Sequence, residues 1–542
     1  MLRPSLPRFQ PADLVAGFLV SLIALPLCLG ISLASGFPAS AGVFTAIVGG
    51  LLVSFLGGSQ LTIKGPAAGL IVIALGAVTD LGQGEPERGY PFALACIVVA
   101  GILQVLLGLV RGGILGEIFP LPVVKGMLMA IGIIVMVKQL YPTLGLQPIG
   151  KDLPSQIAAL PGALAHSHPI AAGIGLASLF LLVLWERLPW PNLKRLPAAL
   201  LVFLLGIVVG HIFSLRDSKP LKILGDQWPR GPQFMVQLPE EALDFITFPD
   251  FTRIWEPLSI KYIFLFALIG SLETLLSTRA VDLLDPWHRR AQLHRDLTGV
   301  GIGNVLAALL GGLPMISEII RSSANVSYGA RTWWSNFFHG FFLLLYLTAG
   351  ASLIQRVPLA ALGAILVYTG FRLAHPSKFA QLWHTGRQEF IVAVVTVVFT
   401  LSTDLLIGIL AGTLAQITWH MARGLRPTDF FGISLSPEYD NDHNTLYIHI
   451  RGALVFSNFH SLNKLIEKVE VKQKIVLDFK EARGLDHTAL SHLKELATLR
   501  HDQGGILELK GLELLHAISS HPLATRYKKN HRPIFNFKGF KF

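Results

Sequence analysis

The fold of this chain is decided by the stretch FLGGSQLTIKGPAAG at residues 55–69, because a second stretch of the same design follows much later. The second stretch is LLGGLPMISEIIRSS at residues 309–323. Each stretch starts near a Gly-Gly pair at the end of an apolar run, continues through a few extended residues and opens a new helix. In the first stretch we expect the helix to begin at Pro66, since proline suits the first turn. Two such segments, one in each half of a membrane protein, indicate half-helices whose positive ends meet at one site, which favours an anion.

The composition independently indicates a membrane protein. The 542 residues are 52% hydrophobic and 15% charged, and the mean hydropathy is +0.56, whereas soluble domains carry about 25% charged residues. The net charge of +11 fits Lys and Arg flanking membrane spans better than it fits nucleic-acid binding. Only Cys28 and Cys96 are present, both in apolar runs, which indicates neither a disulfide framework nor a metal site. The first apolar run lacks a signal-peptide pattern, so we expect it to be retained as a span.

Fourteen apolar segments have the length of a span or of part of one. They cover residues 12–33, 40–56, 66–79, 91–111, 120–139, 169–187, 197–214, 260–278, 297–311, 319–328, 335–355, 358–373, 388–403 and 405–422. The short third and tenth segments are the two half-helices. Because an odd number of segments reverses the second repeat, this order predicts two inverted repeats of seven, about 12–214 and about 260–423, joined by the loop at 215–261.

Basic residues predict the orientation of the spans. Arg3 and Arg8 precede the first span, and Arg423 and Arg426 follow the last. The positive-inside rule therefore places the N- and C-termini in the cytoplasm.

The sequence changes character after Pro427, and we expect a transporter domain at 1–426 and a cytoplasmic domain at 427–542. Residues 445–451 alternate like a half-buried strand, 459–469 form an amphipathic helical pattern, and 474–479 are typical of a buried strand. A second helical pattern at 488–500 and a strand at 505–509 complete a small α/β domain.

Short motifs in this order and spacing resemble the sulfate permease family of anion transporters, which includes solute carrier family 26. The motifs are ALPL at 24–27, KGPA at 64–67, GSLET at 270–274, GIGN at 301–304, GGLP at 311–314 and RSSAN at 321–325. DHTAL at 486–490 resembles the turn that opens a helix in the family's STAS domain. The resemblance covers nearly the whole chain and implies an α-helical polytopic membrane protein, with two inverted seven-segment repeats and a cytoplasmic STAS-like domain.

The resemblance also implies how such a protein works. The substrate pocket would lie between the third and tenth segments, with the eighth beside it. A core domain would move against a gate domain in an elevator-like alternating-access cycle. The protein would be a homodimer in the inner (plasma) membrane.

Candidate substrate-binding residues lie where the two half-helices begin. Arg321, at a position where the family often carries an arginine, would attract the anion or pair with Glu318, and the two roles can coexist. Small residues would let backbone N–H groups approach a ligand closely. The substrate-binding candidates are Ala67, Ala68, Gly69, Ser317, Glu318, Ile319, Arg321 and Ser322. The supporting candidates are Lys64, Pro66, Thr274 and Asn325.

Glu273 is the candidate for binding the coupling ion. A carboxylate in the middle of an apolar helix is a functional hypothesis by default. It would carry a proton, or bind sodium as in sodium-coupled relatives that place an aspartate here; a structural role at a helix break is the third reading. Proton coupling is the preferred reading. Ser277 shares the face of Glu273 at helical spacing.

Glu318 departs from the family pattern, which often has a small residue at this position. An acid beside an anion site repels the substrate unless it is protonated or paired. Aligning the two stretches matches Glu318 with Lys64, which predicts an ion pair between them; the alternative is a second proton site. The distantly related nucleobase transporters also use carboxylates on the eighth and tenth segments, so a neutral, uracil-like substrate stays open.

These features predict a secondary active transporter of a small anion, such as bicarbonate, sulfate, chloride, nitrate or a dicarboxylate, coupled to H⁺ or Na⁺. The alternatives are an anion channel, an uncoupled exchanger, a nucleobase-type proton symporter, or a membrane-anchored regulator whose STAS-like domain is the active part. We expect neither enzymatic activity nor catalytic residues, cofactors or metals, because His288, His294, His339 and His420 lack metal-ligand spacing. The expected partners are the anion, the lipid bilayer and a second copy of the chain, but no nucleic acid.

Overall fold

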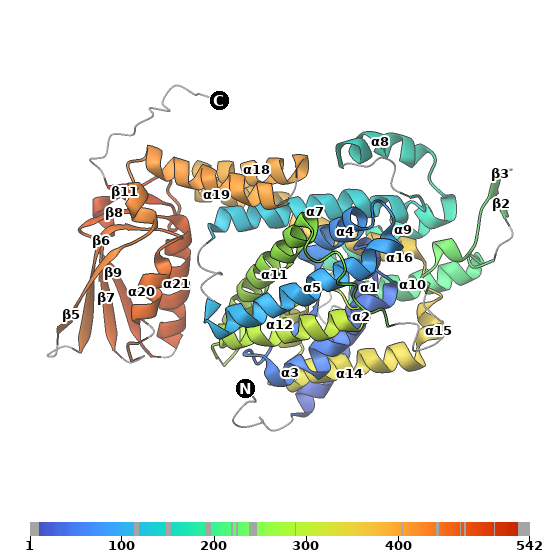
Figure 1. Ribbon diagram of the computed structural model, residues 1–542, viewed down its shortest axis with the longest axis horizontal. Helices are drawn as coiled ribbons and strands as arrows, with labels where there is room; N and C mark the ends of the chain where they lie inside the picture. Colours follow the sequence, from blue (N-terminus) through green and yellow to red (C-terminus); the bar gives the residue numbers. More distant parts are fainter. Residues whose placement is uncertain are drawn as a thin grey trace. The chain divides into compact units, whose positions relative to one another are not determined.

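The computed structural model describes residues 10–528 except 113–118, 148–152, 190–196, 218–219, 224–225, 238–245, 288, 404, 441–443, 467, 471–472 and 503. Arg3, Arg8 and His288 lie outside these residues. Eight of the described helices are long and apolar enough to cross a membrane, and two shorter apolar helices cover Ala68–Leu81 and Ala198–Ile212. The chain is therefore a polytopic α-helical protein with an α/β domain at its C-terminal end, as the sequence predicts (Figure 1).

The predicted apolar segments match the described helices closely. The first half contains α1 (Pro11–Ala34), α2 (Ala39–Leu51), α3 (Val53–Leu56), α4 (Ile71–Leu81), α5 (Pro86–Leu109), α7 (Leu121–Thr143), α8 (Leu153–Ala165), α9 (Pro169–Arg187) and α10 (Ala198–Ile212). The second half contains α11 (Pro257–Leu284), α12 (Leu293–Leu309), α13 (Ile319–Ser327), α14 (Trp334–Ala349), α15 (Ala351–Ile354), α16 (Leu359–Leu373), α17 (Pro376–Thr385), α18 (Arg387–Ser402) and α19 (Leu405–Ala422). The division into seven-segment repeats stays a prediction.

Two short helices and one hairpin before the α/β domain were not expected from the sequence. Helices α8 and α17 lie between apolar segments, and a hairpin of β2 (Leu221–Ile223) and β3 (Asp226–Trp228) lies in the connection between the two halves. Helix α17 carries several polar residues, so an apolar-run criterion does not detect it.

The chain divides into two compact units. The first comprises Met1–Gly113 and Ile131–Leu373, and the second comprises Ile114–Ala130 and Ala374–Phe542. Helices α17–α19 and the start of α7 therefore belong to the same compact unit as the α/β domain. The expected domain boundary at 426/427 stays a prediction.

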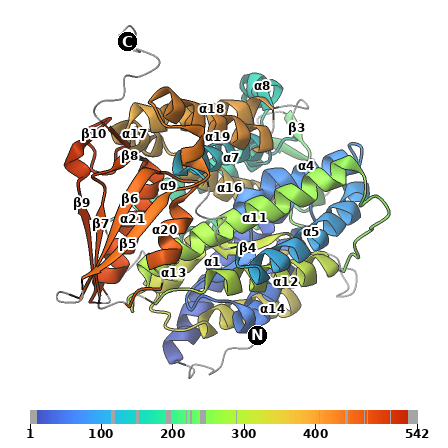
Figure 2. The same cartoon turned by 60° about the vertical axis from the view of Figure 1, so that its left-hand side comes forward.

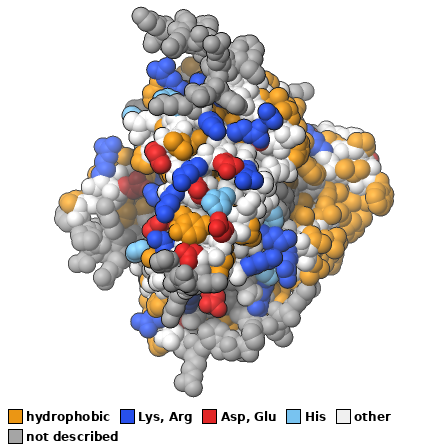
Figure 3. Space-filling view, turned by 90° about the vertical axis from the view of Figure 1, so that its left-hand side faces the viewer, with side chains coloured by type: hydrophobic (Ala, Val, Ile, Leu, Met, Phe, Trp, Pro, Cys, Tyr) orange, Lys and Arg blue, Asp and Glu red, His pale blue; other side chains and the backbone are white. Residues whose placement is uncertain are grey.

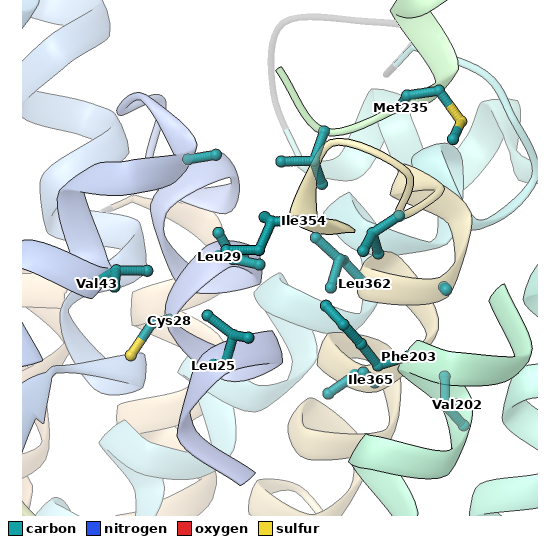
Figure 4. Packing of buried hydrophobic residues seen from close by; sticks show 14 of the residues in the cluster. Leu25, Cys28, Leu29, Val43, Val202, Phe203, Met235, Ile354, Leu362 and Ile365 are labelled. Carbon is teal, nitrogen blue, oxygen red and sulfur yellow. The ribbon is translucent and has the colours of Figure 1, made fainter. Parts of the chain in front are cut away.

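The core of the first unit is built around α1. Leu25 and Leu29 of α1 lie in one buried cluster with Phe203 of α10 and with Leu362 and Ile365 of α16 (Figure 4). Because lipid is as apolar as leucine, such contacts stabilise the bundle through close packing rather than through exclusion of water.

Glycine permits a close helix crossing between α2 and α14. A Cβ atom on Gly50 of α2 would lie 2.5 Å from the Cα atom of Gly340 on α14. A Cβ atom on Gly340 would in turn lie 2.8 Å from Gly50 Cα. The two backbones can therefore touch only because both residues lack a side chain.

The α/β domain is a seven-stranded sheet with strand order β10-β11-β8-β6-β7-β9 and with β5 paired to β6 (Figure 2). Its strands are β5 (Ser434–Asp440), β6 (Thr445–Leu454), β7 (Lys474–Asp478), β8 (Ala482–Leu485), β9 (Ile506–Lys510), β10 (Leu515–Ala517) and β11 (Arg526–Lys528). Its helices α20 (Phe459–Ile466) and α21 (His487–Asp502) share a buried cluster with β6 and β7. The predicted strands and helices are all present. Strands β5, β8, β10 and β11 were not predicted. In β5, most residues are exposed and Pro437 lies in the middle, and a proline argues against a strand inside a sheet.

One face of the second unit carries acidic and basic side chains side by side (Figure 3). Exposed ion pairs of the sheet include Arg451–Glu481 at 2.7 Å and Lys474–Glu508 at 2.8 Å. Such interspersed charge is typical of a surface in contact with water.

Candidate substrate site

The two half-helices begin at a short antiparallel ribbon. Strand β1 (Ile63–Pro66) pairs with β4 (Met315–Glu318). β1 is followed by a 3₁₀ turn at Ala68–Leu70 and then α4, whereas β4 continues directly into α13. The sequence therefore predicted both half-helices, and the ribbon brings segments about 250 residues apart into register.

The prediction that Pro66 opens the first half-helix was wrong. Pro66 is the last residue of β1 and lies opposite Met315. The Ala67 N–H donates to the Pro314 carbonyl at 3.2 Å, which continues the ribbon by one more bond. The helical backbone starts only at Ala68, because pairing with β4 holds the chain extended through Ala67.

Two buried asparagines bond the backbone of the ribbon. The Met315 N–H donates to Asn304 Oδ1 at 2.5 Å, and Asn304 Nδ2 donates to the Met315 carbonyl at 3.2 Å. On the other strand, the Lys64 N–H donates to Asn336 Oδ1 at 3.1 Å. These amides from α12 and α14 give partners to backbone groups that would otherwise be unsatisfied inside the membrane.

Lys64 is buried in a network whose acid is Asp296, the fourth residue of α12. Lys64 Nζ lies 2.6 Å from Asp296 Oδ2 and also donates to Ser317 Oγ at 2.5 Å and Thr62 Oγ1 at 2.8 Å. Asp296 Oδ2 accepts from Ser317 Oγ at 2.9 Å and from Thr278 Oγ1 at 2.8 Å. Both charges therefore have close partners, as a buried ion pair requires.

The predicted pairing of Lys64 with Glu318 was wrong, because the register of the two strands differs by one residue from the predicted one. Lys64 lies opposite Ser317, and Glu318 lies opposite Ile63. Because side chains alternate along a strand, this shift turns Glu318 away from the face that Lys64 occupies. The sequence alone gives no sign of the role of Asp296, since an acid in the first turn of a helix is usually explained by the helix dipole.

Arg321 lies in the first turn of α13 and is only 1% exposed. Its Nη2 donates to the Pro66 carbonyl at 3.3 Å and lies 3.9 Å from Glu318 Oε1. Its Nη1 contacts Cys28 Sγ at 3.5 Å, and Nε has no hydrogen-bond partner among the described residues. A Cβ atom on Gly65 would lie 2.3 Å from Nη1, so only glycine lets the guanidinium lie across β1.

Two buried carboxylates lie around the start of the first half-helix. Glu273 of α11 is 6% exposed, and its side chain is so close to Gly69 that a Cβ atom there would lie 1.7 Å from Oε1. The Ala68 N–H donates to the Glu318 carboxylate, and the charges of Glu273 and Glu318 interact. Neither oxygen of Glu273 has a hydrogen-bond partner among the described residues. Helix α11 continues unbroken through Glu273, so Glu273 does not bond a backbone group at a helix break.

The remaining substrate-binding candidates have different surroundings. Ala67 and Gly69 are buried, Ala68 is half-buried, and Ile319 is 42% exposed. Ser317 has its hydroxyl engaged by Lys64 and Asp296. The Ser322 hydroxyl accepts from the Ile63 N–H at 2.8 Å and donates to the Glu318 carbonyl.

The other candidates lie close by. Asn325 Nδ2 donates to the Leu61 carbonyl at 2.9 Å and to Ser335 Oγ at 2.8 Å, so it links α13 to the segment before β1 and to α14. Thr274 is fully buried next to Glu273 in the sequence, and Ser277 is half-buried one turn later.

His339 is a polar residue near the site that sequence reasoning did not select. It lies on α14, is fully buried, and interacts electrostatically with Arg321. Neither ring nitrogen has a hydrogen-bond partner among the described residues. A histidine in an otherwise apolar segment is a sequence signal for a functional role, although His339 lacks metal-ligand spacing.

The sulfate permease family model matches residues 11–396, and a STAS domain model matches residues 436–513. This chain belongs to the sulfate permease family. The match spans both strands of the ribbon and all the candidate residues. The family is one of transporters.

Curated relatives of this family member carry names of anion transporters. "Putative sulfate transporter YvdB" of Bacillus subtilis is 28% identical over 94% of this chain and 94% of its own length. The bicarbonate transporter BicA of Picosynechococcus is 24% identical over 74% of this chain and 68% of its own length.

Solved structures show the same fold. The transmembrane domain of a cyanobacterial bicarbonate transporter BicA aligns with a TM-score of 0.62 at 23% identity, over 74% of this chain and 97% of that one. Murine Slc26a9, an anion transporter in the inward-facing state, aligns with a TM-score of 0.66 at 15% identity, over 93% of this chain and 86% of that one.

Proposed function

We propose that this protein is a secondary active transporter of a small inorganic anion, with sulfate and bicarbonate as the first candidates. The relatives named for sulfate and bicarbonate support the substrate class. The observation that carries the proposal is Arg321, a buried cation at the start of α13 whose Nε has no hydrogen-bond partner among the described residues. A helix N-terminus and a guanidinium together stabilise an anion.

The charges around this site support coupling to a cation. Arg321 contributes one positive charge, and Glu273 and Glu318 contribute two negative charges when both are ionised. In that state the three side chains carry a net negative charge, which repels an anion. Protonation of both carboxylates leaves the charge of Arg321 uncompensated, so anion binding is favoured together with proton uptake.

Glu273 is the proposed coupling residue, and Glu318 is a second proton site that also competes with the anion for Arg321. The 3.9 Å separation between Arg321 Nη2 and Glu318 Oε1 is long for an ion pair. Glu318 can therefore leave Arg321 at little cost when an anion arrives. Sodium is the second candidate ion, because the oxygens of Glu273 have no hydrogen-bond partner among the described residues and carboxylate oxygens bind hard cations.

We further propose the setting in which transport occurs. The protein would work as a homodimer in the inner membrane, with both termini in the cytoplasm. The core domain around the ribbon would move against a gate domain, and the STAS-like domain at 427–542 would regulate this movement. Enzymatic activity is not expected of a member of a transporter family.

Uptake by purified protein in liposomes tests this function. We expect sulfate or bicarbonate to be concentrated under an inward proton gradient. Glu273→Gln, which resembles the protonated form, should still bind the anion but should not concentrate it. Glu87→Gln, at an exposed position of α5, is the matched control and should behave like the wild type.

The ion gradients separate the alternatives. Persistent proton-driven accumulation by Glu273→Gln would contradict the role of this residue. Uptake driven by sodium alone would identify sodium as the coupling ion. Anion flux that only follows its own gradient would indicate a channel or an uncoupled exchanger instead.

A further inference from the structure

A pocket of about 370 Å³ lies where α5 ends and α12 begins. It is lined on one side by Leu109 and Arg111 and on the other by His294, Arg295 and Thr298. None of its lining residues belongs to the candidate substrate site. The pocket is therefore separate from the candidate substrate site.

The polar side of this pocket is built for an anion. Arg295 Nε donates to the Leu56 carbonyl at 3.1 Å, which fixes the guanidinium, while Nη2 is buried without a hydrogen-bond partner among the described residues. Arg111 supplies a second cation. The first turn of the 17-residue helix α12 adds N–H groups and the positive end of the helix dipole.

Asp296, which follows Arg295 in the sequence, does not cancel this charge. Asp296 accepts from Lys64 Nζ at 2.6 Å and from the Gly58 N–H at 3.0 Å, so its charge is compensated within the ribbon network. Among the described residues, neither arginine of the pocket forms an ion pair with an acid, so both can bind an external anion.

The other side of the pocket is apolar and continuous with a lipid-facing stripe. Leu56, Leu109 and Ile302 line the pocket. Along α5, Ile102, Leu106 and Leu109 recur at helical spacing and are 47%, 52% and 53% exposed. In a membrane protein such a stripe contacts acyl chains, and here it leads directly to two arginines.

We propose that this pocket binds the phosphate headgroup of an anionic phospholipid, whose acyl chains lie along α5. The apolar stripe favours a lipid over a free anion, because a free phosphate would make no use of it. In the topology proposed above, α5 ends and α12 begins on the cytoplasmic side, where anionic lipid headgroups attract basic pockets. The lipid site does not depend on which anion is transported.

Occupation of this pocket should also affect the ribbon. Arg295 precedes Asp296, whose carboxylate holds Lys64 of β1. The Gln292 N–H, at the start of α12, donates to the Gly58 carbonyl at 3.2 Å. A bound headgroup would therefore reduce the motion of the segment from Gly58 to the start of β1.

The test compares full-length protein in nanodiscs of phosphatidylcholine with protein in nanodiscs that also contain phosphatidylglycerol. Retained lipid is counted by native mass spectrometry after transfer to detergent. We expect the wild type to retain phosphatidylglycerol selectively. Arg295→Gln and Arg111→Gln should each weaken retention by about fivefold, the contribution of one basic residue at an anionic membrane surface. Arg356→Gln, an equal charge change at an exposed position before α16, should leave retention unchanged.

Two further measurements keep the result clear. Arg111 is exposed, so Arg111→Gln tests the site without removing the bond that Arg295 makes to Leu56. Inorganic phosphate is added in a separate arm and should neither displace the lipid nor raise the thermal stability of the protein. Equal retention by the wild type and the Arg295→Gln/Arg111→Gln double variant would overturn the proposal. Stabilisation by phosphate as strong as that by the lipid would overturn it in favour of a free-anion site.

Discussion

At the scale of single residues, the buried charges around the ribbon fall into two groups. Lys64 and Asp296 lie within 2.6 Å of each other and have further hydrogen bonds, which is the pattern of a structural pair. Arg321, Glu273 and Glu318 each retain polar atoms without a hydrogen-bond partner among the described residues. A buried charged group without all of its hydrogen-bond partners raises the free energy of the folded protein. A ligand or a proton that binds to the second group would therefore stabilise the protein most.

Replacing Arg321 should separate its role in anion binding from its role in the fold. Arg321→Ala is expected to weaken anion binding by about tenfold to a hundredfold, the range for a hydrogen bond to a charged group. Arg321→Lys should bind more tightly than Arg321→Ala, because it keeps the charge. Glu318→Gln should strengthen anion binding, because it removes the competing carboxylate. Calorimetry measures the affinities, and size-exclusion elution checks the fold; unchanged affinity in Arg321→Ala would refute the assignment.

The pairing of Lys64 with Asp296 makes a prediction about stability. Lys64→Met and Asp296→Asn should each lower the free energy of unfolding by about 3–5 kcal/mol, because each leaves a buried group without its partner. The double variant should lose less than the sum of the two. Thermal unfolding in detergent measures all three. Glu318→Gln is the control and should change stability little; a loss as large as that of Asp296→Asn would mean that the pairing is misassigned.

At the scale of elements, the ribbon of β1 and β4 leads into both half-helices and carries Glu318. Glycines in the ribbon and in the turn that follows it allow side chains of other elements to come close. Gly65 accommodates the guanidinium of Arg321, and Gly69 accommodates the carboxylate of Glu273. The geometry of the site therefore depends on the absence of side chains at Gly65 and Gly69.

Adding one methyl group to the ribbon turn should displace the coupling residue. Gly69→Ala would place a Cβ atom 1.7 Å from Glu273 Oε1, so the carboxylate must move. We expect transport in liposomes to fall by about tenfold or more, since small displacements of a reacting group have large effects. Gly173→Ala on α9 is the matched control, because its Cβ atom would have no neighbour within 4 Å. Normal proton-driven uptake by Gly69→Ala would contradict the role of this contact.

At the scale of the whole molecule, the second unit joins α18 and α19 to the α/β domain through buried polar contacts. Thr525 Oγ1 donates to Glu389 Oε1 at 2.7 Å, and Tyr527 OH lies 2.8 Å from His420 Nδ1. Asp486, which opens α21, accepts from the Ala489 N–H at 2.7 Å and lies 3.8 Å from His420 Nε2. The start of the STAS-like helix therefore belongs to the same polar cluster as the last two apolar helices.

Two adjacent residues of this domain should give opposite pH dependence. Burial raises the pKa of Asp486 to about 7, against the effect of the backbone N–H groups that bond it. Burial lowers the pKa of His487 to about 4. As the pH falls from about 7 to about 4, Asp486 takes up a proton preferentially in the folded state and stabilises it. Over the same window His487 takes up a proton preferentially in the unfolded state, which destabilises the fold.

The two contributions, each on the order of 3 kcal/mol, largely cancel in the wild type. Relative to the wild type, Asp486→Asn should lose stability as the pH falls through this window, and His487→Gln should gain it. Hydrogen exchange of β6 and β7 in the full-length protein, corrected for intrinsic rates, measures both. Changes of the same sign in the two variants would show that these residues do not titrate as described.

The sequence by itself determined the family, the order of the apolar helices, the α/β domain and the presence of both half-helices. These features follow from local signals, namely runs of apolar residues, Gly-Gly pairs and strand alternation, which do not depend on distant contacts. It also selected Arg321, Glu273 and Glu318, because a charge inside an apolar helix is conspicuous wherever it lies.

The tertiary structure alone decided which charges are partners. Pairing of β1 with β4 sets a register in which Lys64 faces Ser317, and a slip of one residue reverses the face of every side chain in a strand. Asp296 reaches Lys64 from 232 residues away, and no local pattern encodes that distance. The same is true of the pocket between α5 and α12, whose two arginines become neighbours only when the two helices pack together.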